Sequence, residues 1–178
     1  KHYFDPYNAG LYASLALIGR VVYFTAWMFV MLLLPKVIEL KKEGKKTHLI
    51  LFKYIGYISF LSCVITTICA LFPETIVQLL FGESYLEISS LLWKYSLATS
   101  LFAVSNIFAY YFLSLDQYIP VIISGIFGLL QLVLIIWFHE TLAQVVQMQI
   151  IAMFALLGIQ VLFYIILLRP IKIFQVLK

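Results

Sequence analysis

Charged side chains are scarce in this chain. Twelve basic and eight acidic residues make up 11% of the 178 residues, whereas hydrophobic residues make up 64%. Soluble domains carry about 25% charged residues. Because the apolar stretches are also long, so few charges cannot cover a water-facing surface. The composition therefore predicts an integral membrane protein.

Residues suited to metal or acid–base chemistry are also few. Cys63 and Cys69 lie in one apolar stretch, at a spacing that suits neither a metal site nor a redox pair, so we interpret them as small buried hydrophobic residues. His2, His48 and His139 lie far apart at the edges of apolar stretches, and no carboxylate lies deep inside one. We therefore expect no enzyme activity, no metal site and no cofactor.

Five apolar runs fill most of the chain. Each is about 20 to 28 residues long, and about 20 helical residues cross a hydrocarbon core of about 30 Å. The runs do not alternate as the strands of a membrane barrel would. They predict an all-α fold, a polytopic membrane helical bundle of about five transmembrane helices, with about 70% of the chain in helices. The runs are residues 11–34, 49–71, 88–115, 119–138 and 141–168.

Lysine and arginine between the runs predict the orientation. The segment PKVIELKKEGKKTH holds five lysines against two glutamates, and the tail RPIKIFQVLK is also basic, whereas FPETIVQLLFGESYLE holds three glutamates and no basic residue. Basic loops remain in the cytoplasm. We therefore expect a cytoplasmic C-terminus and an N-terminus outside. The surrounding partners are membrane lipids, and no nucleic acid is expected because no soluble domain presents the lysines.

Arg20 interrupts the first run, within LALIGRVVYFTAWMFVMLLL. As the tenth residue of the run, it lies about 13 Å from the outer end, near the middle of the bilayer. A guanidinium at that depth costs about 2.5–3.5 kcal/mol. Lys53 and Lys94 lie within a turn or two of a span end and can extend to water. Arg20 therefore either has a buried partner or faces a cavity that receives an anion.

Small and polar residues recur at helical spacing in the other runs. An unpaired amide in lipid is costly, so Asn106 and Gln131 either pair with each other or line the same cavity as Arg20. The small residues for which we expect close helix packing are Gly56, Ser59 and Ala103. In the last run, Gln144 and Gln147 are predicted to share a face, with Gln149 and Gln160 off that face.

The segment PETIVQLLFG predicts a short helix between the second and third runs. Pro73 suits a first helical turn, Glu74 favours a helix N-terminus, and Gly82 suits a C-terminal cap. Its apolar face is predicted to consist of Ile76, Leu79 and Leu80.

Three segments carry a resemblance to a known family: AGLYASLALIGRVVYF, LLLPKVIELKKEGK and LFPETIVQLLFGESY. The resemblance depends on the order and spacing of Gly10, Tyr12, Arg20, Pro35, a run of lysines, Pro73 and Gly82. With these features the chain resembles the C-terminal half of bacterial polysaccharide flippases of the O-antigen type. That family belongs to the multidrug/oligosaccharidyl-lipid/polysaccharide exporter superfamily.

The resemblance implies two helical lobes around a central cavity. We therefore expect this chain to be one lobe of a two-lobed transporter fold and part of a longer protein, with the missing N-terminal lobe as its partner. The implied activity moves a polyprenyl-pyrophosphate-linked oligosaccharide across the cytoplasmic membrane by alternating access. Arg20 would bind the pyrophosphate. The candidates for glycan contacts are Tyr12, Tyr23, Asn106, Tyr110, Tyr111 and Gln131.

Two other classes remain open. One is a multispan membrane enzyme of glycan assembly, such as a polymerase or ligase, which would be expected to carry acidic, arginine or histidine residues in a large outer loop. The longest outer segment here is short and contains three glutamates. The other class is a noncatalytic membrane subunit whose polar stripes bind partner helices.

Overall fold

The structure, a computed structural model, describes residues 6–168, of which 91% are helical and none form strands. Five helices are long and apolar enough to cross a membrane. They are α1 (Pro6–Lys42), α2 (His48–Leu71), α4 (Ser89–Ser114), α5 (Ile119–Trp137) and α6 (Leu142–Leu168). The predicted all-α polytopic bundle is therefore confirmed. The predicted helix content of about 70% is too low, because α1 is longer than expected and residues 73–88 are helical as well.

Helix α1 departs most from its predicted span. It has 37 residues and continues through Pro35, so the basic segment expected to be a loop is helical as far as Lys42. A proline inside a helix removes one backbone hydrogen bond. Leu33 and Val37, on either side of it, are completely buried and hold this turn against the bundle. Packing therefore outweighs the local cost of the proline.

The predicted short helix between the second and third runs is confirmed. Its C-cap, Gly82, has φ 87°, a conformation that glycine adopts without strain. The face containing Leu79 and Leu80 points out of the bundle, while Val77 is the residue that packs inside. The two elements here are α3 (Pro73–Phe81) and the 3₁₀ helix η1 (Glu83–Ile88).

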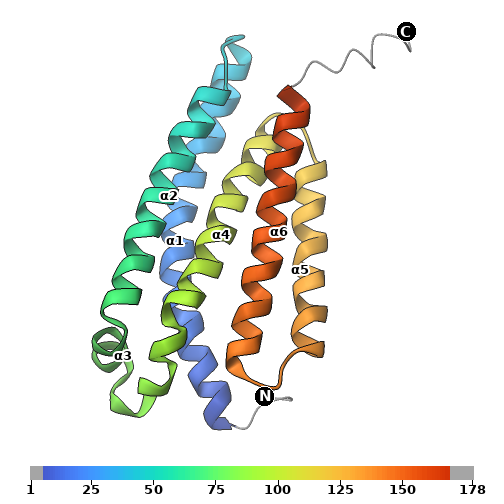
Figure 1. Ribbon diagram of the computed structural model, residues 1–178. Helices are drawn as coiled ribbons and strands as arrows, with labels where there is room; N and C mark the ends of the chain where they lie inside the picture. The colour runs from blue at the N-terminus through green and yellow to red at the C-terminus, as the bar shows by residue number, and fades with distance from the viewer. Residues whose placement is uncertain (1–5, 169–178) are drawn as a thin grey trace.

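Helix α4 lies at the centre of the bundle, between the α1–α2 pair and the α5–α6 pair (Figure 1). The α1–α2 connection and the described end of α6 lie at the same end, opposite α3 (Figure 1). The lysine-rich α1–α2 connection and the C-terminal end of α6 thus lie at one end of the bundle, as the prediction that both basic segments share a side requires. The basic tail lies outside the described residues, and the orientation in the membrane remains a prediction.

The interior differs between the two ends of the bundle. At the lysine-rich end, the buried core includes a cluster of aromatic rings, in which Tyr164 meets Phe108 edge-on and is tilted against Phe112. At the other end the core is mostly aliphatic, with Leu11 and Leu92 completely buried. The remaining packing predictions concern five residues: Ala103 and Cys69 are buried as expected, but Gly56, Ser59 and Cys63 are exposed on α2. Within the described chain, the expected burial of these three is wrong.

Candidate functional site

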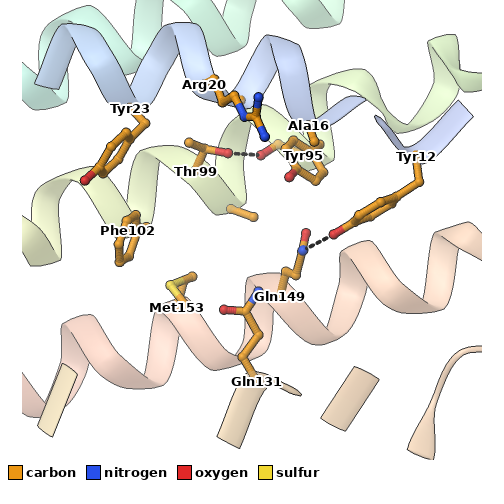
Figure 2. Close-up of a pocket in the computed structure, with 12 residues that line it drawn as sticks. Tyr12, Ala16, Arg20, Tyr23, Tyr95, Thr99, Phe102, Gln131, Gln149 and Met153 are labelled. Atoms are coloured by element: carbon orange, nitrogen blue, oxygen red, sulfur yellow. Dashed lines mark hydrogen bonds between the residues drawn. The ribbon is translucent and has the colours of Figure 1, made fainter. Parts of the chain in front are cut away.

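A groove of about 460 Å³ opens beside α4, between α1 on one side and α5 and α6 on the other (Figure 2). Its volume falls within the range of about 300–1,000 Å³ that is usual for ligand pockets. Helix α1 contributes Tyr12, Ala16, Gly19, Arg20 and Tyr23; α4 contributes Tyr95, Ala98, Thr99 and Phe102; α5 and α6 contribute Gln131, Gln149 and Met153.

Arg20 lies on the wall of this groove, and its side chain is exposed. The structure gives it no ion pair and no hydrogen bond within residues 6–168. The alternative of a buried arginine satisfied by neighbouring groups is therefore not observed in this part of the chain. A guanidinium carries five N–H donors in a planar fork. All of them remain available to an anionic ligand.

Gly19 allows α1 to approach α4 closely next to Arg20. A Cβ atom at this position would lie 2.8 Å from Thr99 Oγ1 and closer still to the ring of Tyr95. Such distances are too short for packed atoms, so only glycine fits without moving these two side chains. The close approach brings the Tyr95 ring and the Thr99 hydroxyl into the groove with Arg20 (Figure 2).

One hydrogen bond crosses the groove. Gln149 Nε2 on α6 donates to the Tyr12 hydroxyl on α1 at 2.5 Å, and the Tyr12 ring meets the Tyr95 ring edge-on at 6.1 Å between centroids. The Thr99 hydroxyl donates to the Tyr95 carbonyl of its own helix at 3.0 Å. Tyr12 and Gln149 thus bridge α1 and α6 beyond Arg20, and the groove is a bounded space (Figure 2).

Aromatic rings form the other end of the groove. Tyr23 on α1 stacks on Phe102 of α4, with centroids 5.7 Å apart and an angle of 20° between the ring planes. Trp27 lies one turn further along α1, with its ring centroid 5.9 Å from that of Tyr23. The groove therefore combines one cation, amide and hydroxyl groups, and flat aromatic surfaces.

The structure brings together four of the seven predicted binding residues. Arg20, Tyr23 and Gln131 line the same groove. Asn106 and Tyr110 do not line it; Tyr110 instead packs edge-on against Trp27, and no hydrogen bond joins Asn106 to Gln131. Neither arrangement expected for Asn106 is therefore observed. Of the further candidates, Tyr12 lines the groove, whereas Tyr111 is buried and its hydroxyl is hydrogen-bonded to Thr47.

The face of α6 that packs inside the bundle carries Gln149 and Gln160, the two amides predicted to lie off the face of Gln144 and Gln147. Gln149 and Gln160 are 7% and 0% exposed, whereas Gln147 is exposed. Gln160 Nε2 donates to Ser124 Oγ of α5 at 2.9 Å and so joins these two helices. A spacing of eleven residues is close to three helical turns and places both amides on one face. That spacing was the available signal, and it was obscured because α6 is apolar on every side.

Comparison with family models, curated proteins and solved structures finds no match for this chain. The groove must therefore be interpreted from its own chemistry. Among the described residues, no group of three or more histidine, cysteine, aspartate or glutamate side chains could hold a metal ion. The arrangement can bind an anion at Arg20 and polar, ring-shaped groups beside it.

Proposed function

We propose that this chain is the substrate-binding lobe of a flippase for polyprenyl-pyrophosphate-linked oligosaccharides. One observation carries the proposal: an arginine in the middle of an apolar helix faces a groove and has no partner among the described residues. Intramembrane arginines almost always face a cavity or a partner, and they mark the paths of substrates and ions. The sequence resemblance to polysaccharide flippases supports the same assignment.

Each chemical part of such a substrate has a counterpart in the groove. The pyrophosphate would bind the Arg20 fork, which can hold two phosphate oxygens at once. Sugar rings would pack against the stacked Tyr23–Phe102 pair, and their hydroxyls would exchange hydrogen bonds with Gln131 and Thr99. The polyprenyl tail can remain in lipid, since exposed apolar side chains cover the outside of the bundle.

Translocation then requires movement around the site and no covalent chemistry. In transporters built from two lobes, one lobe rocks against the other around a site near the bilayer midplane. Arg20 lies near the midpoint of the first apolar run, and the groove opens on the side of α4 away from α2. A second lobe facing this side would enclose the substrate and expose it alternately to the two leaflets.

Binding to the complete protein that carries this chain tests the proposal. The probe is polyprenyl-pyrophosphoryl-N-acetylglucosamine in detergent micelles, with uncharged polyprenol as the comparison ligand. We expect Arg20→Ala to weaken probe binding at least tenfold, and Arg20→Lys to fall in between because lysine keeps the charge but loses the fork. Lys94→Ala removes a cation outside the groove and should bind the probe as the wild type does.

The same variants also test the alternatives. Normal probe binding by Arg20→Ala would overturn the proposed role of Arg20. If Arg20→Ala is poorly inserted or rapidly degraded, the arginine instead holds helices together, as expected for a noncatalytic subunit. Transport of the lipid-linked glycan should follow the same order as binding: wild type, Arg20→Lys, Arg20→Ala.

A further inference from the structure

A second groove, of about 400 Å³, lies at the lysine-rich end of the bundle. It is formed where α1 ends and α2 begins, at the top of Figure 1. Its lining residues are Leu40, Lys45, Lys46, Leu49, Ile50 and Lys53. None of these residues lines the Arg20 groove, so this site is separate from the one already described.

The backbone around this groove is fixed by hydrogen bonds. At the end of α1, Lys45 N–H donates to the Leu40 carbonyl at 2.9 Å and Gly44 N–H donates to the Lys41 carbonyl at 3.1 Å. Gly44 has φ 68°, so the helix ends in a Schellman turn. The Thr47 hydroxyl is hydrogen-bonded to Tyr111 of α4 at 2.9 Å. The backbone that carries the groove is therefore held in shape before any ligand binds, which lowers the entropic cost of binding.

Two of its three lysines have no carboxylate partner. Lys45 pairs with Glu43 at 2.8 Å, and the hydrogen bond from this ammonium lowers the pKa of the Glu43 carboxyl. Lys46 and Lys53 form no salt bridge within residues 6–168, although Lys53 Nζ lies 5.8 Å from the ring centroid of Tyr57. The groove thus presents two ammonium groups that have no carboxylate partner among the described residues.

Apolar side chains border these cations. Leu40, Leu49 and Ile50 line the groove between the lysines. Leu49 is 68% exposed, and Phe52, on the next turn of α2, is 54% exposed. A soluble anion would contact only the lysines, whereas a ligand with a charged head and apolar chains would contact both surfaces.

We propose that this groove binds the headgroup of an anionic glycerophospholipid. The phosphate lies between Lys46 and Lys53, and the acyl chains run along Leu49 and Phe52. Basic pockets beside membrane-spanning helices bind anionic headgroups through such combined contacts. The excess of lysine predicts that this end faces the cytoplasm, where anionic lipids concentrate. This inference does not depend on the proposed transport function.

Lipid selectivity measures this site directly. The protein is reconstituted in phosphatidylcholine vesicles containing one-fifth phosphatidylglycerol, and spin-labelled forms of the two lipids report their relative association constants. We expect the wild type to prefer phosphatidylglycerol. The Lys46→Gln/Lys53→Gln double variant should lose about fivefold or more of that preference. The matched control, Lys42→Gln/Lys94→Gln, removes two cations outside the groove and should keep it.

Three results would overturn the proposal. An equal loss in both double variants would mean that net charge, rather than the groove, attracts the lipid. Displacement of spin-labelled phosphatidylglycerol by millimolar glycerol phosphate would identify a site for soluble phosphate. Displacement by soluble polyglutamate would identify a site for an acidic protein segment. Persistence of the wild-type preference in the presence of both competitors supports a lipid site.

Discussion

The two sides of α4 carry their polar side chains in opposite ways. Toward α2, the Thr66 hydroxyl lies 3.0 Å from Ser96 Oγ and 3.4 Å from Ser100 Oγ, and these groups satisfy one another. Toward α1, α5 and α6, Gln149 is hydrogen-bonded to Tyr12, but Arg20 and Gln131 have no hydrogen-bond partner among the described residues. Polar groups that pair across helices hold the bundle together. Polar groups that face a groove unpaired remain available to a ligand.

Adding a side chain at Gly19 should have the largest effect on stability, because α1 packs directly against α4 at this residue. Gly19→Ala places a Cβ against Tyr95 and Thr99, so we expect the free energy of unfolding to fall by about 1–3 kcal/mol. Unfolding by a denaturing detergent, followed by circular dichroism, measures the change. Gly56→Ala is the control, since a Cβ there meets no atom within 4 Å. Equal destabilisation of the two variants would contradict the close approach of α1 and α4.

Removing the Ser96 hydroxyl should weaken the contact between α2 and α4 and leave the Arg20 groove unchanged. Ser96 is completely buried, and Ser96→Ala deletes its contact with Thr66. Hydrogen bonds between membrane helices contribute about 0.6 kcal/mol on average, with a maximum near 1.7. We expect a loss of stability in this range and unchanged binding of the lipid-linked probe.

Two variants sharpen this test. Ser105→Ala on the same helix removes only a bond to its own backbone, to the Leu101 carbonyl, and serves as the control. A double-mutant cycle of Ser96→Ala with Thr66→Val isolates the interhelical contact. A coupling energy of zero would show that the Thr66–Ser96 contact does not stabilise the bundle. A loss of probe binding by Ser96→Ala would show that the α2-facing side of α4 also contributes to binding.

The exposed ion pair between Lys41 and Asp116 should give the smallest change in stability of the three tests. Lys41 Nζ lies 2.6 Å from Asp116 Oδ2, with both side chains well exposed. Exposed pairs contribute about 0.2–1 kcal/mol, and salt screens them. Asp116→Asn keeps a residue that tolerates the φ of 62° found here. We expect a loss below about 1 kcal/mol that disappears at high salt; a larger, salt-independent loss would contradict a surface role.

Run length and end signals in the sequence were sufficient to predict the helices. Five apolar runs gave five long helices, and Pro73, Glu74 and Gly82 correctly marked the short α3. These features depend on residues close together in the chain. The continuation of α1 beyond Pro35 could not be predicted in this way, because burial of its neighbours against other helices sustains it.

The candidate site was predicted only in part, because most of its residues are brought together by contacts between helices. The depth of Arg20 predicted either a buried partner or a cavity, because an unpaired charge in lipid is costly wherever the neighbouring helices lie, and the structure shows the second of these. Tyr95, Thr99 and Gln149 were missed, since the inward face of an apolar helix depends on how the helices rotate against one another. Gly19 was missed as well, because the chain must fold before a close approach identifies the glycine that permits it.

Helix α1 mechanically links the two grooves. Arg20 and Leu40 belong to one continuous helix and lie about 30 Å apart along its axis. Between them, Pro35 leaves the Met31 carbonyl without its usual helical donor. Leu33 and Val37, both completely buried, nevertheless hold this turn against the bundle, so the helix continues through it. The two grooves are therefore built on one packed helix, and ligands bound in both would lie at a separation set by that helix.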